Sequence, residues 1–253
     1  MGMDGRVIFY AFVGMAFGLL SFYKGIKWMR QKRLIENIPT SKIRSLAMGL
    51  AEVFGEALPA GKEILKSPFS GKDCVYYRYT VEEYRSSGKH RSWATIDKGN
   101  SRERFFLKDS TGQVLVDPDG AKVDIPMDFE YRPSGKIPER IKEFAEKSGL
   151  RYKNVLGFNK NMRFREYFIQ PGENVYILGT AGDNPFVEEG TAKHGMEDVM
   201  IQKGRDEKIY YISDKPEKGV LKNLRIKMAG GIIGGAALTV GSLAVILIYL
   251  RLL

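Results

Sequence analysis

Side chains suited to chemistry are scarce in this chain. Among its 253 residues there is one cysteine, Cys74, and there are two histidines, His90 and His194. A zinc site takes four Cys, His or carboxylate ligands, or three with an open position, and a cross-brace zinc domain holds two such sites. One cysteine and two histidines cannot supply the two sites of a cross-brace domain, and a single cysteine excludes an intrachain disulfide. The sequence therefore predicts no metal site, no cofactor and no catalytic residue.

The surroundings of these three residues favour the same interpretation. Cys74 opens the strand-like run CVYY, where a free cysteine commonly packs as a small hydrophobic residue. His90 lies between two cations in an expected loop, and His194 lies in the polar stretch 190–195. We expect solvated imidazoles and no nucleophile among the three side chains.

Two segments resemble ligand-binding loops without meeting their requirements. Residues 55–62 read GEALPAGK, but five residues separate the glycines where a phosphate-binding loop has four, and Glu63 replaces the Mg²⁺-binding Ser or Thr. Residues 117–120 read DPDG, like part of a calcium loop, but Asp128 stands where the bidentate glutamate is required. Neither segment is expected to bind its ligand, and the second is interpreted as a turn.

Two apolar runs bracket the chain and must position everything between them. Residues 7–23 and 228–250 contain no charged side chain, and roughly 20 apolar residues cross a bilayer core. A cleaved signal peptide is the alternative for the first run. Its start, however, carries Asp4 beside Arg6, and no small-residue cleavage site follows. We predict an integral membrane protein with two transmembrane helices.

Basic residues collect at the inner ends of both runs, in a juxtamembrane arm (24–37) and a second collar (214–227). We expect anionic lipid headgroups to bind there, at about 1 kcal/mol per basic residue, through Lys24, Lys27, Arg30, Lys32, Arg33, Lys218, Lys222, Arg225 and Lys227. Residues 34–214 hold 28 Lys and Arg against 28 Asp and Glu. A phosphate-binding face should show on the domain itself, so nucleic acid is not an expected partner.

The same collars predict the orientation of the protein. Basic residues that flank a span stay on the cytoplasmic side, and the ten bases at the inner ends outweigh Arg6 and Arg251 at the outer ends. We therefore expect a protein of the cell membrane whose middle domain is cytoplasmic and whose termini are outside.

Small residues recur at four-residue spacing within both runs. This spacing brings helices close together in lipid, and the residues concerned are Gly14, Gly18, Gly230, Gly231, Gly234 and Gly235. Either the two spans of one chain pack as a hairpin, or spans of neighbouring chains form a homo-oligomer.

The middle of the chain, residues 38–213, has the pattern of a β-rich domain. Short strand-like segments, such as 74–84 and 164–169, alternate with Asp, Gly and Pro turns. One helix is expected from Pro138, at its first position, to Gly149, which ends it. The predicted fold class is mainly β: a small barrel-like, OB-like or sandwich domain with one helical insertion, between two transmembrane helices.

Four ordered segments of this domain resemble a known family. They are IPTSKIRSLAMGLAEV at 38–53, SPFSGKDCVYYRY at 67–79, FLKD with GQVLVDP at 106–118, and VYILGTA at 175–181. Together they are similar to the GIDE domain, also called the beside-a-membrane domain. The best-known members are mulan-type membrane E3 ubiquitin ligases of organelles, in which the domain lies between two spans and a C-terminal RING finger performs the ligase chemistry.

The resemblance implies a recognition domain without the catalytic half of such a ligase. The sequence ends three residues after the second run, where a RING would follow, and its Cys and His content cannot form one. RING-less chains of this layout are similar to prokaryotic, especially archaeal, proteins. The expectation is a membrane scaffold or adaptor that binds an unknown protein partner, and the alternative is a component of a ligase-like system. In organellar relatives the domain faces the intermembrane space, which would place it outside the cell, but we follow the charge bias.

Overall fold

The structure is a computed structural model that describes residues 5–87, 90–133, 137–152, 160–186, 198–205, 209–214 and 217–250. The chain divides into two compact units. One comprises Met1–Pro39 with Glu217–Leu253, and the other comprises Thr40–Pro216.

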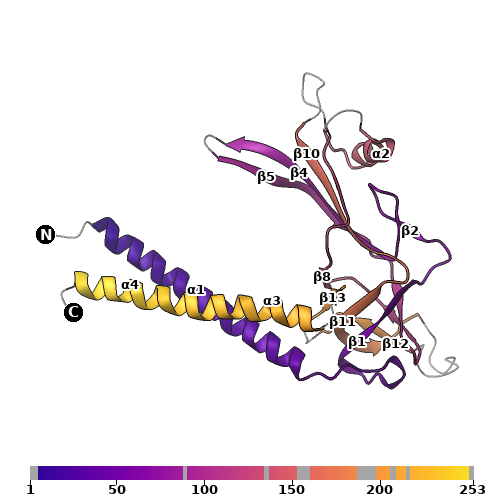
Figure 1. The fold of residues 1–253 in the computed structure, drawn as a ribbon, viewed down its shortest axis with the longest axis horizontal. Helices are drawn as coiled ribbons and strands as arrows, with labels where there is room; N and C mark the ends of the chain where they lie inside the picture. Colours follow the sequence, from indigo (N-terminus) through magenta and orange to yellow (C-terminus); the bar gives the residue numbers. More distant parts are fainter. Residues whose placement is uncertain are drawn as a thin grey trace. The chain divides into compact units, whose positions relative to one another are not determined.

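The first unit is an antiparallel pair of long helices. Helix α1 covers Gly5–Glu36, and the returning helix consists of α3 (Glu217–Ala229), a π-helical turn η2 (Gly230–Gly234) and α4 (Gly235–Tyr249). In Figure 1 the two helices lie side by side, with both ends of the chain at the same end of the pair. Gly5–Arg33 and Leu221–Tyr249 are long and apolar enough to cross a membrane.

The second unit contains a closed five-stranded barrel. Its strands are β1 (Gly49–Pro59), β6 (Phe105–Lys108), β7 (Gln113–Val116), β11 (Asn174–Asp183) and β12 (Val199–Gln202). They pair in the order β1-β6-β7-β12-β11, and β11 pairs back to β1. Within this ring only β7 and β12 run parallel. This ring order, with one parallel contact between its third and fifth strands, has the connectivity of an OB fold.

Every second side chain along the strands is buried inside the barrel and fills its core. On β6 and β7, Phe105, Leu107, Val114 and Val116 are buried, and the residues between them are half-buried or exposed. These side chains meet Val53 and other buried residues of β1, β11 and β12 in one apolar core. Two short parallel strands, β13 (Tyr211–Ser213) and β8 (Lys122–Asp124), extend the sheet beyond β11.

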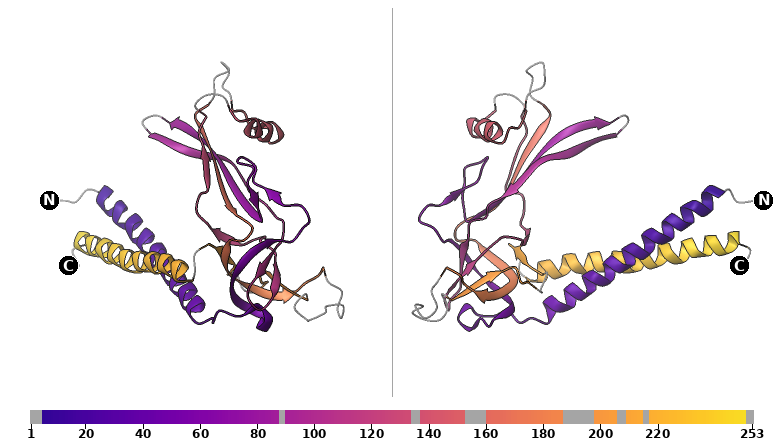
Figure 2. Two further views of the ribbon diagram at one scale, coloured as in Figure 1. Left: turned by 45° about the vertical axis from the view of Figure 1, so that its right-hand side comes forward. Right: turned by 180° about the vertical axis from the view of Figure 1, so that it is seen from behind.

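The segments that connect the barrel strands form a second sheet. Its order is β5 (His90–Asn100), β4 (Tyr76–Ser87), β10 (Met162–Ile169) and β9 (Phe129–Tyr131). The hairpin β4–β5 lies between β1 and β6 in the chain, whereas β9, helix α2 (Glu139–Lys147) and β10 lie between β7 and β11. Figure 2 shows α2 beside this sheet, and Ile141 and Phe144 join its core with Val81 and Phe164.

A buried carboxylate fastens the loop before β4 to this second sheet. Glu166 on β10 is fully buried and accepts hydrogen bonds from the backbone N–H groups of Phe69 and Ser70, the latter at 3.0 Å. The Phe69 ring then makes edge-to-face contacts with Phe144 and Phe164, with centroids 4.9 and 5.3 Å away. The Ser-Pro-Phe-Ser-Gly segment is therefore an anchor between loop and sheet. A ribbon of β2 (Leu65–Lys66) and β3 (Asp73–Cys74) flanks it.

The predicted fold class is confirmed. The domain is mainly β, its core is barrel-like, and apolar helices precede and follow it. Two local expectations are wrong. Pro138 is the N-cap of α2 instead of its first helical residue. His90 is not in a loop but opens β5, because the β4–β5 pairing continues as far as Ser87 opposite His90.

Candidate functional site

An apolar row crosses the outer face of the barrel. Phe106 on β6 is paired with Leu58 on β1 and with Leu115 on β7, and Leu115 is paired with Met200 on β12. Paired side chains lie on one face of a sheet, and this face is opposite to the one that fills the barrel core. Phe106 and Leu115 remain half-buried, so they form an apolar floor that is not fully covered.

Residues from two connections between barrel strands enclose this floor, and together they form a cleft of about 1000 Å³. Such a volume is at the upper end of the range of small-ligand pockets. One wall belongs to the connection from β1 to β6, and the other is formed by Asn184 and Phe186, which directly follow β11. The lining residues are Pro59, Ala60, Gly61, Glu63, Ile64, Leu65, Lys66, Cys74, Val75, Arg102, Glu103, Arg104, Phe106, Gln113, Leu115, Asn184, Phe186 and Val199.

The position of this cleft in the barrel matches where OB folds bind ligands. The face of the second and third barrel strands, with the loops after the first and fourth strands, is the ligand-binding region of that fold. Here those strands are β6 and β7, and those loops are the two walls of the cleft. The fold therefore offers a binding site at the place where the cavity is found.

An ordered cation–aromatic pair forms the rim. The guanidinium carbon of Arg104 lies 4.0 Å from the centroid of the Phe186 ring, and its Nε donates to Asp117 Oδ2 at 3.0 Å. The backbone N–H of Phe186 donates to Asn184 Oδ1 at 3.2 Å. Phe186 and Ile64 keep 58% and 46% of their surface exposed. The rim thus offers large apolar side chains, held in place, beside charged groups.

Cys74 lies at the back of the cleft but is not poised for chemistry. The residue is fully buried, and its Sγ makes a weak hydrogen bond to the Leu65 carbonyl at 3.5 Å. Burial, reinforced by the charge of Glu166, raises the pKa of the Cys74 thiol to about 12. A thiol with this pKa is protonated at neutral pH and is a poor nucleophile.

The two histidines and the two turn-like segments singled out in the sequence do not form a binding site among the described residues. His194 lies outside the described residues, and the side chains of His90 and Lys218 are likewise not described. Within the described part of the chain, no group of three or more His, Cys, Asp or Glu residues could hold a metal ion. Residues 109–112 and 117–120 form turns in which Asp109 and Asp117 accept backbone hydrogen bonds.

The predicted headgroup collars lie on the two helices of the first unit. Lys32 is half-buried and pairs with Glu36 at 2.6 Å, and the other described collar side chains are exposed: Lys24, Lys27, Arg30, Arg33, Lys222, Arg225 and Lys227. Gly25 of α1 faces Gly231 of η2, so the antiparallel pair gathers both sets of bases on one side of this contact.

The six glycines divide into two groups. A Cβ at Gly18 would come within 2.8 Å of the Thr239 backbone nitrogen, and one at Gly235 would come within 2.6 Å of the Phe22 nitrogen. Gly14 and Gly231 are similarly close to the opposite helix, whereas nothing lies within 4 Å of a Cβ at Gly230 or Gly234. The structure therefore brings Gly14, Gly18, Gly231 and Gly235 together between the helices and leaves Gly230 and Gly234 outside.

The cleft was not anticipated from the sequence. Its floor comes from strands of only four residues, and its walls are segments separated by at least 80 positions along the chain. The available signals were two short apolar pairs, Ile64 with Leu65 and Phe186 with Val187, each in a polar connection. Neither signal alone distinguishes a binding wall from an ordinary surface residue.

Comparison with protein-family models matches residues 76–247 to GIDE, described as "E3 Ubiquitin ligase". The match covers more than half of the chain and extends from β4 to α4. Comparisons with curated proteins and with solved structures found no match.

Proposed function

Because the chain belongs to the GIDE family, whose description is that of an E3 ubiquitin ligase, we propose that it is a membrane-anchored interaction module. Its barrel binds a segment of a partner protein, and its two helices hold that complex at a membrane. The observation that carries this proposal is the cleft with an apolar floor on the ligand-binding face of the barrel.

The chemistry of the cleft fits a polypeptide segment. Phe106 and Leu115 offer apolar contact at the floor, while Arg102, Glu103 and Gln113 offer polar contact at the edge. Protein interfaces combine a buried apolar centre with a polar rim in this way. Arg104 stacked on Phe186 adds a rigid arginine–aromatic pair, the kind of anchor that commonly dominates binding energy.

Anchoring is proposed through both helices. We infer that they span the cell membrane, that the basic collars bind anionic headgroups, and that the domain is cytoplasmic. The support comes from the two apolar helices and from the basic residues at one end of the helix pair, which the positive-inside rule assigns to the cytoplasm. This layout suits a scaffold or adaptor that concentrates a partner at the membrane.

The family description favours a second candidate, the recognition component of a ligase. One cysteine and two histidines cannot form the two zinc sites of a RING. In this alternative another chain supplies the catalytic centre, and the cleft presents either the substrate or that chain. Transfer of ubiquitin or a related protein to the cleft-bound partner would distinguish this candidate from a scaffold.

Site-specific photo-crosslinking in native membranes tests the interaction module. A photoreactive side chain at Ile64 or Phe186 should give the same discrete protein adduct, and Leu115→Asp should abolish it, because a charge on the floor removes apolar contact. Matched positions outside the cleft are Met48 and Phe54, which are 58% and 42% exposed. An adduct of equal yield from these controls, or one that survives Leu115→Asp, would contradict the proposal.

A further inference from the structure

The four-stranded sheet has a second face that the cleft does not use. Val81, Phe164 and Tyr131 are cross-strand partners on the face that packs against Phe69 and α2. The neighbouring pairs, such as Glu82 with Arg163 and Glu130 with Arg165, therefore project from the opposite face.

This opposite face is rich in cations. Among the described residues of these strands and the residue after β9, it carries two carboxylates, Glu82 and Glu130, and six cations: Arg78, Arg91, Lys98, Arg132, Arg163 and Arg165. The excess is local, because residues 34–214 as a whole hold equal numbers of basic and acidic side chains. We name this surface the basic face.

Aromatic rings hold several of these guanidinium groups flat. The Arg163 guanidinium lies 4.3 Å from the centroid of Trp93, and that of Arg78 lies 4.2 Å from the centroid of Tyr167. A stacked guanidinium keeps its in-plane N–H donors available for a carboxylate or phosphate. Among the described residues, Arg78 has no carboxylate partner, and its buried Nε has no acceptor.

The carboxylates on the basic face fix further cations instead of neutralising the surface. Glu82 forms ion pairs with Arg163 and, at 3.4 Å, with Arg165. Glu130 forms ion pairs with Arg165 at 2.6 Å and with Arg132 at 2.7 Å. Each carboxylate thus orients two guanidinium groups and leaves positive charge in excess. Cations held in this way lose little conformational freedom when an anion binds.

We propose that the basic face binds an acidic segment of a partner protein in extended conformation. Cations two positions apart on β10, Arg163 and Arg165, are separated by about 7 Å along the strand. Alternate side chains of an extended peptide have the same spacing. Carboxylates pair well with arginine forks. Nucleic-acid bases, which bind by stacking on aromatic rings, are disfavoured as ligands, because guanidinium groups already lie over the Trp93 and Tyr167 rings.

The test uses the full chain in nanodiscs of zwitterionic lipid and a fluorescent dodecapeptide of alternating Glu and Thr. Binding is followed by fluorescence anisotropy. We expect binding that weakens with salt, and an affinity about tenfold lower after Arg78→Gln, Arg91→Gln and Lys98→Gln are combined. The matched control removes the same charge from other exposed sites of the domain, Lys42→Gln, Arg44→Gln and Lys62→Gln, and should change the affinity less than about twofold.

Three outcomes would overturn the proposal. One is equal loss of affinity in the control triple variant, which would mean attraction by net charge alone. Another is equal affinity for a peptide that carries the six Glu residues in one block. The third is tighter binding of single-stranded nucleic acid or of anionic-lipid vesicles to the same face. Lys98→Glu alone, an exposed change, repeats the measurement if the triple variant does not fold.

Discussion

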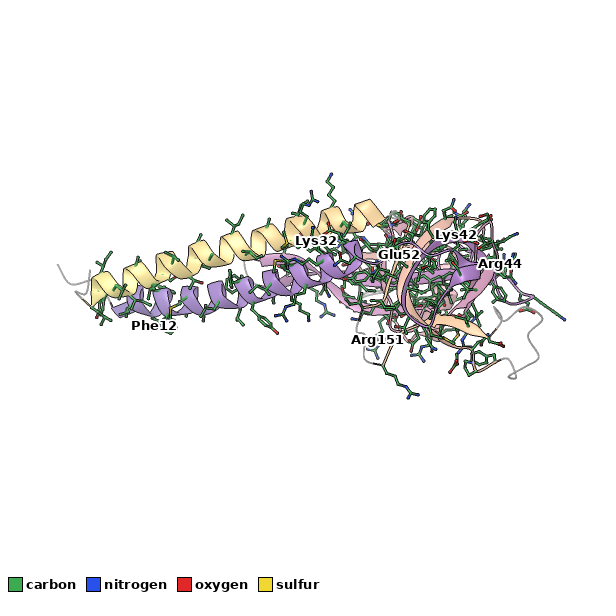
Figure 3. All side chains as sticks on the ribbon, turned by 90° about the horizontal axis from the view of Figure 1, so that it is seen from below. Phe12, Lys32, Lys42, Arg44, Glu52 and Arg151 are labelled. Carbon is green, nitrogen blue, oxygen red and sulfur yellow. The ribbon has the colours of Figure 1, made fainter. Side chains whose placement is uncertain are left out.

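Among the described residues of the domain, the two fully buried carboxylates are structural. Glu52 has no exposed surface, and it accepts hydrogen bonds from Thr40 Oγ1 at 2.6 Å and Tyr176 Oη at 2.8 Å. Figure 3 labels it within the domain. Glu166 is bound by two backbone N–H groups in the same way. Because donors satisfy both carboxylates, each fixes a neighbouring segment to a strand.

Alkylation of Cys74 by iodoacetamide should be slow in the folded protein. With a pKa of about 12, the thiolate fraction at pH 8 is about a thousandfold below that of an unfolded cysteine. The rate should rise about tenfold per pH unit below pH 12. The raised pKa also favours the folded state below about pH 9, and this contribution is lost as the pH rises towards 12.

A control for this measurement is Ser110→Cys, which places a thiol on the exposed turn between β6 and β7. It should react at the ordinary rate. Equal rates at positions 74 and 110, measured by mass spectrometry of the intact protein, would show that the Cys74 thiol is accessible and refute its burial.

At the scale of elements, the ion pairs of the second sheet predict acid sensitivity. A hydrogen bond from Arg165, the largest influence, lowers the pKa of Glu130 below its ordinary 4.5. Glu130→Gln should therefore destabilise the domain by about 0.5–1 kcal/mol at pH 7. The lowered pKa means that this stabilisation is present above pH 4.5 and is lost as the pH falls through the pKa of the folded state.

The measurement is urea unfolding followed by the emission of Trp93, in a Trp28→Phe background. The free-energy difference between parent and Glu130→Gln should shrink towards zero in acid. Glu63→Gln is the matched control, because Glu63 is exposed and the described residues give it no ion pair. A difference that stays constant from pH 7 to pH 3 would mean that the Glu130 charge has no part in stability.

The helix pair predicts unequal effects of two glycine substitutions. Gly18→Ala should separate the helices, because its Cβ would meet the Thr239 backbone, whereas Gly234→Ala meets nothing within 4 Å. Overpacking of this kind costs about 1–3 kcal/mol. Spin labels at Val7, near the start of α1, and at Tyr249, at the end of α4, are both exposed and should give a longer or broader distance distribution only for Gly18→Ala. Equal distributions for the two variants would contradict the packing.

Strands with a clear local pattern were predictable from the sequence, and several very short strands were not. The β-branched and aromatic run at 74–84 predicts β4, and the apolar positions Ile141, Phe144 and Ala145 predict α2. Strands such as β8, β9 and β12 have three or four residues. Their existence depends on pairing with distant segments, which local propensity does not encode. The cleft could not be predicted for the same reason, since its lining residues come from six separate segments of the chain.

At the scale of the whole molecule, the charge bias predicts orientation. In a cell that expresses Ser110→Cys, a membrane-impermeant maleimide should label this cysteine only after lysis, if the domain is cytoplasmic. A cysteine added at the C-terminus should be labelled in intact cells. Because Cys74 is buried, it should contribute little maleimide labelling of its own. Labelling of position 110 without lysis would assign the domain to the outside and overturn the charge argument.

The order of synthesis gives the helix pair a further consequence. Gly18 lies at one end of the chain and its partner Gly235 at the other, so translation at about 5–20 residues per second leaves α1 without α4 for roughly 10–40 s. The barrel between them is complete before α4 emerges, since β12 and β13 precede it. During that interval the glycine surface of α1 is open to the same surface of a neighbouring nascent chain. We therefore expect closer spacing of ribosomes on the messenger to raise the share of α1 helices that meet a neighbouring chain before their own α4 has been made.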